Sequence, residues 1–152
     1  MKREQLKAPD LTQRPPRSPR VRLGGYVILP RCLDKGRATL AGRNGEYKFA
    51  CPLDQGLLKF AGIKADALKK QLALGKSDGE ILDWINRHSS TKPQPWEIAQ
   101  WSAHQSERGP TDVETREHFT GLLTKVSKKR DDVVGWFDLL DLDDYASFGG
   151  QV

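Results

Sequence analysis

Several features of membrane, secreted and disulfide-rich proteins are missing from this sequence. No apolar run approaches the ~18 residues that a membrane-spanning helix needs, so we expect no membrane association. The opening M-K-R-E-Q-L-K-A-P-D contains no apolar segment, which argues against a secretory signal. The two cysteines, Cys32 and Cys51, are too few for a disulfide framework. We therefore expect a cytoplasmic protein in which both are reduced, buried thiols.

The common sequence motifs of catalysis are missing as well. There is no glycine-rich phosphate loop and no G-x-S-x-G motif. The cysteines and histidines show none of the paired spacings of a zinc site, so we expect no metal and no cofactor. His88 is expected in or at the edge of the core, and His104 and His118 at the surface. A nucleophilic Cys–His pair stays open, because such pairs form in space rather than in sequence.

The composition is that of one folded domain, but its charge is unevenly distributed. Of 152 residues, 37% are hydrophobic and 30% charged, and the net charge is +5. Residues 1–48 carry 12 lysines and arginines against four acids, whereas residues 131–152 carry six aspartates and no base. Such segments either pack on each other or face different partners. We favour packing, because an arginine fork holds a carboxylate through two hydrogen bonds. The pairs we expect are Arg17 with Asp141 and Arg37 with Asp144.

The rest of the chain is predicted to be arranged around residues 23–54. A helix is indicated by residues with the spacing of one helical face, which are Leu29, Cys32, Leu33, Gly36 and Leu40. Pro30 suits its first turn and Gly42 its end. Residues 46–51 alternate like a short strand. Either residues 26–29 pair with it in a small β-hairpin or, as we favour, residues 23–29 form an extra helical turn or two with a kink at Pro30, because an isolated hairpin is marginally stable.

This segment reads L-G-G-Y-V-I-L-P-R-C-L-D-K-G-R-A-T-L-A-G and continues through N-G-E-Y to C-P-L-D. Before it stands L-T-Q-R-P-P-R-S-P-R, and near the end of the chain W-F-D-L-L-D-L-D-D-Y-A-S-F-G-G. Together these motifs resemble an uncharacterised bacterial family, the domain of unknown function 5069. The resemblance spans nearly the whole chain. It implies a single cytosolic domain and no known activity, cofactor or catalytic residue.

Further short helices are predicted from apolar spacing and from capping signals. They cover residues 54–61 and 65–74, a segment after the capping box at 77–80, and a segment from Pro95 to the Gly109-Pro110 stop. Two more follow a second capping box at 111–114 and a cap at Asp131 or Asp132. The sequence therefore predicts an all-α fold, an irregular bundle of six or seven short helices, with one small β-hairpin as the open alternative.

Residues 1–22 are predicted to form an extended arm, rich in arginine and proline, that packs on the core. Three prolines within residues 14–20 exclude a regular helix there, and four apolar residues can anchor the arm. These anchors are Leu6, Leu11, Val21 and Leu23. Residues 23–148 are expected to form a single helical domain, and residues 149–152 a flexible tail.

The residues expected to bind a ligand come mostly from the basic front. They are Arg17, Arg20, Arg31, Asp34, Lys35, Arg37 and Arg43. Arg31 and Lys35 are like charges at i and i+4, which is unfavourable without an anion between them, whereas Asp34 and Arg37 can pair. A solvated helix face is the alternative explanation. The clustered aspartates at the end could hold magnesium, but they match no ligand motif.

The function stays unknown at this level. We favour a small intracellular binding or interaction module that holds an anionic small molecule or an acidic protein. The alternative is an enzyme of unknown reaction with a pocket near Asp34, Arg37, Cys51 and Asp54. A weak, non-specific nucleic-acid binder is the third interpretation. Specific nucleic-acid recognition is not expected, because the acidic end and the lack of a reading motif oppose it. A homodimer stays open.

Overall fold

The computed structural model describes residues 6–152, and seven α-helices lie within them. The helices are α1 (Leu29–Leu40), α2 (Pro52–Ala61), α3 (Ala65–Ala73), α4 (Asp78–His88), α5 (Pro95–Glu107), α6 (Val113–Val126) and α7 (Trp136–Ser147). The β-pairing among these residues is one isolated bridge between Leu23 and Tyr26. The predicted all-α fold is confirmed, and the hairpin alternative is wrong.

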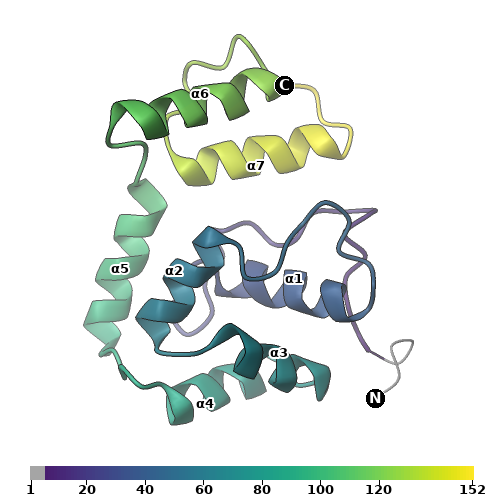
Figure 1. Cartoon of the computed structure of the whole chain (residues 1–152), viewed down its shortest axis with the longest axis vertical. Coiled ribbons are helices and arrows are strands. Elements are labelled where there is room, and N and C mark those ends of the chain that lie inside the picture. The colour runs from purple at the N-terminus through teal and green to yellow at the C-terminus, as the bar shows by residue number, and fades with distance from the viewer. Residues whose placement is uncertain (1–5) are drawn as a thin grey trace.

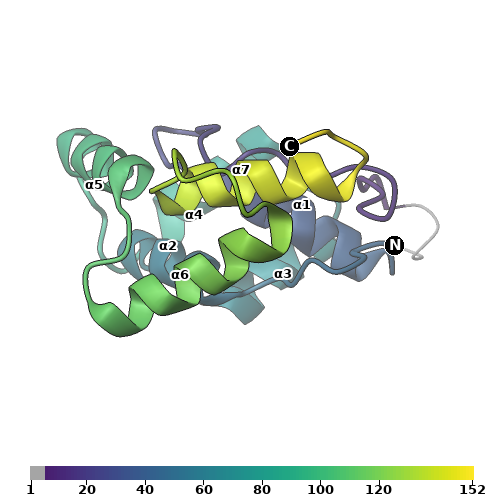
Figure 2. The same cartoon turned by 90° about the horizontal axis from the view of Figure 1, so that it is seen from above.

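The helices are arranged in two layers joined along one side. Helices α1 to α4 form one layer, α6 and α7 lie beside each other above it, and α5 runs from one layer to the other (Figure 1). Seen from above, α7 lies over α1 (Figure 2). The loop of residues 41–51 rises from the end of α1 toward α7 before the chain turns into α2 (Figure 1).

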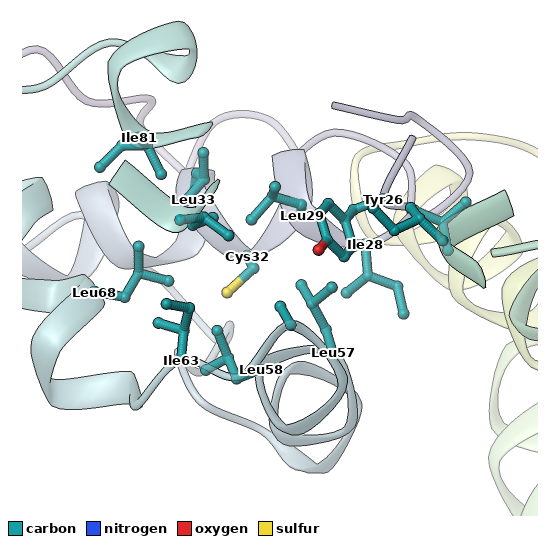
Figure 3. Packing of buried hydrophobic residues seen from close by; sticks show 14 of the residues in the cluster. Tyr26, Ile28, Leu29, Cys32, Leu33, Leu57, Leu58, Ile63, Leu68 and Ile81 are labelled. Carbon is teal, nitrogen blue, oxygen red and sulfur yellow. The ribbon is translucent and has the colours of Figure 1, made fainter. Parts of the chain in front are cut away.

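The main core is built around α1. Leu29, Cys32 and Leu33 are fully buried and belong to one cluster with Leu57 and Leu58 of α2, toward which Cys32 points (Figure 3). Burying one leucine side chain contributes about 1.5–3 kcal/mol, so this face accounts for a large share of the stability. A smaller cluster joins α6 and α7 and contains Phe119, Val133, Leu139 and Leu142.

The start of α1 differs from both alternatives for residues 23–29. The chain makes a turn at Gly24 and Gly25, which have φ of 59° and 86°, and the helix begins only at Leu29. Ile28 precedes the helix at φ 73°, a left-handed conformation that is uncommon for a β-branched residue. The extra helical turns before Pro30 are therefore wrong, because two glycines with positive φ cannot continue a right-handed helix.

Most predicted helix ends are confirmed. Gly42 has φ 71° and follows the last turn of α1, and Gly62 ends α2 at φ 70°. Ser77 caps α4 in a reciprocal capping box with Glu80. At α6 the prediction was wrong by one residue, because the cap is Asp112, which accepts from the Thr115 amide at 2.8 Å.

The predicted start of α7 at Asp131 or Asp132 is wrong. Asp132 instead pairs with Arg130 in a turn, and α7 begins at Trp136, whose amide donates to the Arg108 carbonyl at 3.1 Å. In the segment before α1, Leu11 is buried and Leu6 and Leu23 are half-buried, whereas Val21 is exposed and anchors nothing. Residues 1–5 of the predicted arm lie outside the described residues.

Candidate functional site

A cleft of about 1110 Å³ opens between the loop that follows α1 and the pair α6–α7. Residues 45–48 and 51–53 form one wall, and α6 and α7 form the other. The second wall is largely apolar, with Leu122 and Val126 from α6 and Phe137, Leu139 and Leu140 from α7. Apolar walls of this kind are typical of sites for small molecules.

Asp144 of α7 connects the two walls of the cleft. Arg31 of α1 donates to its Oδ2 at 2.7 Å, and the Tyr47 hydroxyl donates to its Oδ1 at 2.7 Å. The guanidinium of Arg31 also lies 5.5 Å from the Tyr47 ring centroid. The side chains of Arg31 and Asp144 are only 4% and 9% exposed, so this ion pair lies in a desolvated environment. It holds the loop, α1 and α7 in one arrangement.

Burial also shifts acid–base equilibria at this junction. Partial burial, then the hydrogen bond to Asp144, raises the pKa of Tyr47, which therefore stays a neutral hydroxyl donor. The pKa of Asp143, which lines the cleft, is raised by partial burial and by the charge of Asp144.

The predicted packing of the basic front on the acidic end is confirmed within one chain. Ser18 donates to Asp141 at 2.8 Å, and Arg20 forms ion pairs with Asp138 and Asp141. The buried pair of Arg31 and Asp144 belongs to the same contact. The two aspartates bound by Arg20 are exposed or half-buried, so this part of the contact is solvated.

The particular pairs that we expected are wrong. Arg17 holds both oxygens of Asp34 at 3.0 Å and reaches Asp78 at 2.8 Å, and Arg37 reaches Asp78 at 2.7 Å. Asp34 thus pairs with Arg17 and not with Arg37. The reason is that the segment before α1 lies against α1 and the start of α4, where Asp78 is the first helical residue.

The network of Arg17, Asp34, Arg37 and Asp78 shifts the pKa values of two of its members, Asp78 and Arg17. Partial burial opposes the ionised form of Asp78, but the hydrogen bonds from Arg17 and Arg37 outweigh it and lower the pKa of Asp78. Partial burial likewise disfavours the charge of Arg17, yet its bonds to Asp78 and Asp34 raise the pKa of Arg17. All four side chains are engaged with one another, which leaves little capacity for an external anion.

A second cluster lies at the floor of the cleft. Lys35 of α1 lies 2.8 Å from Asp54 Oδ2 and 3.2 Å from Cys51 Sγ. The side chains of Lys35 and Asp54 are 4% and 0% exposed. Cys51 is half-buried and lines the cleft, which corrects the expectation that both thiols are buried, whereas Cys32 is buried as expected.

The structure brings together only some of the candidate residues. Of the seven expected to bind a ligand, Arg31 and Lys35 line the cleft, each next to its own carboxylate. Arg17, Asp34 and Arg37 form the separate network above. Arg20 pairs with α7. Arg43 is exposed, and its carbonyl accepts from the Leu11 amide.

The enzyme pocket suggested by the sequence is likewise split. Cys51 lines the cleft and Asp54 lies behind it, whereas Asp34 and Arg37 are among neither the cleft residues nor the Lys35 cluster. The sequence reasoning did not find four lining residues with basic side chains, which are Lys48, Arg108, His118 and Lys125. They come from three separate segments, and no periodic pattern connects them.

The described residues contain neither a cluster of metal-binding side chains nor a helix that could cross a membrane. Within residues 6–152, no three histidine, cysteine, aspartate or glutamate side chains are grouped as a metal site would require. None of the seven helices combines the length and the apolar character needed to cross a membrane.

The comparison with known proteins gives a family and no function. No curated protein matches the chain. A family model described as a domain of unknown function (DUF5069) matches residues 13–146, which is nearly the whole sequence. The motifs that carried the resemblance therefore reflect membership, and the chain belongs to the DUF5069 family.

Proposed function

We propose that the protein is a binding module whose cleft takes a small amphipathic molecule with an apolar body and an anionic head. The observation that carries this proposal is the cleft itself, a volume of about 1110 Å³ with an apolar wall and basic side chains. The volume is just above the range of about 300–1,000 Å³ typical of small-molecule pockets.

The apolar part of the ligand would lie against α6 and α7. Phe137 and Leu139 are buried on the inner side, while Leu140, Leu122 and Val126 are half-buried along the wall. When a ligand covers half-buried apolar side chains, the binding free energy becomes more favourable by about 25 cal/mol for each Å² of apolar surface removed from water. The wall therefore favours an aliphatic or aromatic body over a fully polar one.

The anionic part would be held by cations that have no acidic partner. Lys48, Arg108 and Lys125 line the cleft, and none of them forms an ion pair with a residue of the described chain. They outnumber the two lining carboxylates, Glu46 and Asp143. The arginines near α1 are poorer candidates, because their charges are already compensated by aspartates.

An anionic fluorescent probe, 1-anilinonaphthalene-8-sulfonate, tests this proposal. We expect saturable binding to the native protein and about tenfold weaker binding to a Lys48→Glu/Lys125→Glu variant, which corresponds to about 1.4 kcal/mol. A Lys59→Glu/Lys92→Glu variant is the matched control, since both of these lysines are exposed and lie outside the cleft.

Because this probe also binds partly unfolded proteins, the urea midpoint and the near-ultraviolet circular dichroism of each variant are compared first. Equal affinities for the wild type, the cleft variant and the control would contradict the proposal.

We also propose a reducing, cytoplasmic location. The support is that both cysteines are free thiols, one of them half-buried in an open cleft.

A further inference from the structure

The basic side chains assigned above to the anionic part of the ligand are divided between the two ends of the cleft. Helices α6 and α7 run side by side in the same direction, and both begin on the side of α5 (Figure 1 and Figure 2). The ring of Trp136, the first residue of α7, has its centroid 6.4 Å from that of His118 on α6. Lys125, in the last turn of α6, lies about 10 Å further along the helix axis, because seven residues at ~1.5 Å each separate it from His118.

Lys48 belongs to the same end of the cleft as Lys125. Its neighbour Tyr47 donates to Asp144 at 2.7 Å. Asp144 lies eight residues beyond Trp136, which is about 12 Å along α7. We call this the loop end, and it is lined by Glu46, Lys48, Lys125 and Asp143. Because two carboxylates share it with the two lysines, the loop end has room for no more than one negative group of a ligand.

The opposite end, which we call the α5 end, carries basic side chains and no lining carboxylate. It is lined by Arg108, which follows α5, by His118 and by Trp136. The Arg108 side chain donates from Nη1 to Gln105 Oε1 at 3.3 Å and has no ion pair among residues 6–152. The rest of its fork is therefore free to hold a carboxylate through two hydrogen bonds. The His118 ring likewise makes no hydrogen bond within the described chain.

Nearby acidic residues do not neutralise the α5 end. Glu107 and Glu114 are exposed and line no part of the cleft. Asp138 of α7 pairs with an arginine before α1. The backbone at this end is also fixed, because the Arg108 carbonyl accepts from the Trp136 amide at 3.1 Å. The α5 end therefore presents uncompensated positive charge at one end of the apolar wall.

We propose that the α5 end is a second anion subsite, so that the ligand carries a negative group at each end of an apolar chain, as a long α,ω-dicarboxylate does. This inference rests on the proposed function, because the same apolar wall takes the chain. A molecule with one negative charge leaves one end of the cleft unused. A molecule with two charges places both beside cations while its methylene groups are removed from water.

Each part of the cleft has a defined contact with such a molecule. At the α5 end, Arg108 holds one carboxylate through paired hydrogen bonds, and His118 donates a ring N–H to it. Leu122 and Leu140 line the cleft about one helical turn beyond His118 and Trp136, so they lie between the two ends and contact the methylene chain. The lysines of the loop end hold the other carboxylate. The separation of the two ends suits an extended chain of the length of decanedioate.

Isothermal titration calorimetry at pH 7 with three carboxylates tests the proposal on the wild-type protein. They are decanedioate, its monomethyl ester, which has the same length and one charge less, and butanedioate, which has both charges but too short a chain to reach both ends. We expect decanedioate to bind about tenfold more tightly than the ester, because it gains hydrogen bonds to Arg108, and butanedioate to bind more weakly than either. Equal affinities for decanedioate and the ester, or for decanedioate and butanedioate, would overturn the proposal.

A variant of the α5 end locates this preference. In Arg108→Gln/His118→Gln, decanedioate should lose its advantage, whereas the ester should still bind through the loop end. Arg87→Gln/His104→Gln is the matched control, because both of these residues are exposed and lie outside the cleft, and it should keep the preference. A preference for decanedioate that survived in Arg108→Gln/His118→Gln would overturn the second subsite. Urea midpoints are compared first, and the wild-type titrations decide the proposal if a variant does not fold.

A failure of the proposed function would give a different result from a failure of the second subsite. If the ester bound to the wild type and more weakly to Lys48→Glu/Lys125→Glu, while decanedioate gained nothing over the ester, the binding function would stand and the second subsite would be overturned. If neither decanedioate nor its ester bound to the wild type, both proposals would be overturned.

Discussion

Arg31 and Asp144 form the charge pair on which the geometry of the cleft most depends. Their side chains are 4% and 9% exposed, and Tyr47 completes the hydrogen bonding of the carboxylate. Removing one partner of a buried pair leaves an uncompensated charge, so we expect Arg31→Met to cost about 3–5 kcal/mol in free energy of unfolding. Urea denaturation measures this cost.

The control for that prediction is Arg20→Met. Arg20 is 43% exposed and bonds to Asp138, which is 53% exposed, so its loss should cost only about 0–1 kcal/mol. If Arg31→Met and Arg20→Met lowered the free energy of unfolding equally, burial would not distinguish the two ion pairs, and the account of the junction would be wrong.

Asp78 gives the protein a defined sensitivity to acid. Its pKa is lowered in the folded state from the ordinary value of 3.8, because bonds from Arg17 and Arg37 outweigh partial burial. A carboxyl with a lowered folded pKa stabilises the protein above its unfolded pKa and loses that contribution as the pH falls through the folded pKa. Asp78→Asn should therefore be less stable than the wild type at pH 7, and the difference should shrink below pH 3.8. A difference that stayed constant from pH 7 to pH 2.5 would contradict this assignment.

The types of these contacts could be predicted from residue composition, but their partners could not. An arginine-rich front and an aspartate-rich end predict ion pairs, and Arg20 and Arg31 make them. Which aspartate meets Arg17 depends on where the segment before α1 crosses the fold, and no local pattern encodes this crossing. The spacing of Arg31 and Lys35 predicts an anion between them. In the structure each has its own carboxylate instead, Asp144 for Arg31 and Asp54 for Lys35.

At the scale of elements, the capping residues of α4 and α6 provide a direct test. Ser77 accepts from the Glu80 amide, and its replacement by alanine should cost about 1 kcal/mol. Asp112→Ala should also lower the urea midpoint, because Asp112 accepts from the Thr115 amide. Thr111→Ala is the matched control and should leave the midpoint unchanged. If Thr111→Ala lowered the urea midpoint more than Asp112→Ala, Thr111 would be the capping residue, as the sequence predicts, and the assignment of Asp112 would be wrong.

Helix existence was easier to predict than helix boundaries. The spacing of Leu29, Cys32 and Leu33 identified α1, because one apolar face is buried. Its start was missed because Ile28 adopts a left-handed conformation that only the packed structure enforces. The start of α7 was missed for a similar reason, since a long-range bond from the Trp136 amide to the Arg108 carbonyl fixes it and the nearby aspartates do not.

At the scale of the whole molecule, the cleft results from the way in which α7 lies over α1. The contacts of the chain's front with its end bring the loop of residues 41–51 opposite α6 and α7 (Figure 1). This arrangement places Lys48, Arg108 and Lys125, which lie far apart in the sequence, around the same cleft. Sequence reasoning could place Cys51 and Arg31 among the candidates, but it had no means of combining cations that lie far apart in the chain.

The most direct test of the central claim is to locate a bound amphipathic anion on the protein. Nuclear magnetic resonance of the ¹⁵N-labelled chain, titrated with decanoate, reports which backbone amides shift. The account predicts saturable shifts confined to residues 45–53, α6 and α7, and their loss in Lys48→Glu/Lys125→Glu. Shifts centred instead on Arg17, Asp34 and Asp78, or no saturable shift at all, would contradict it.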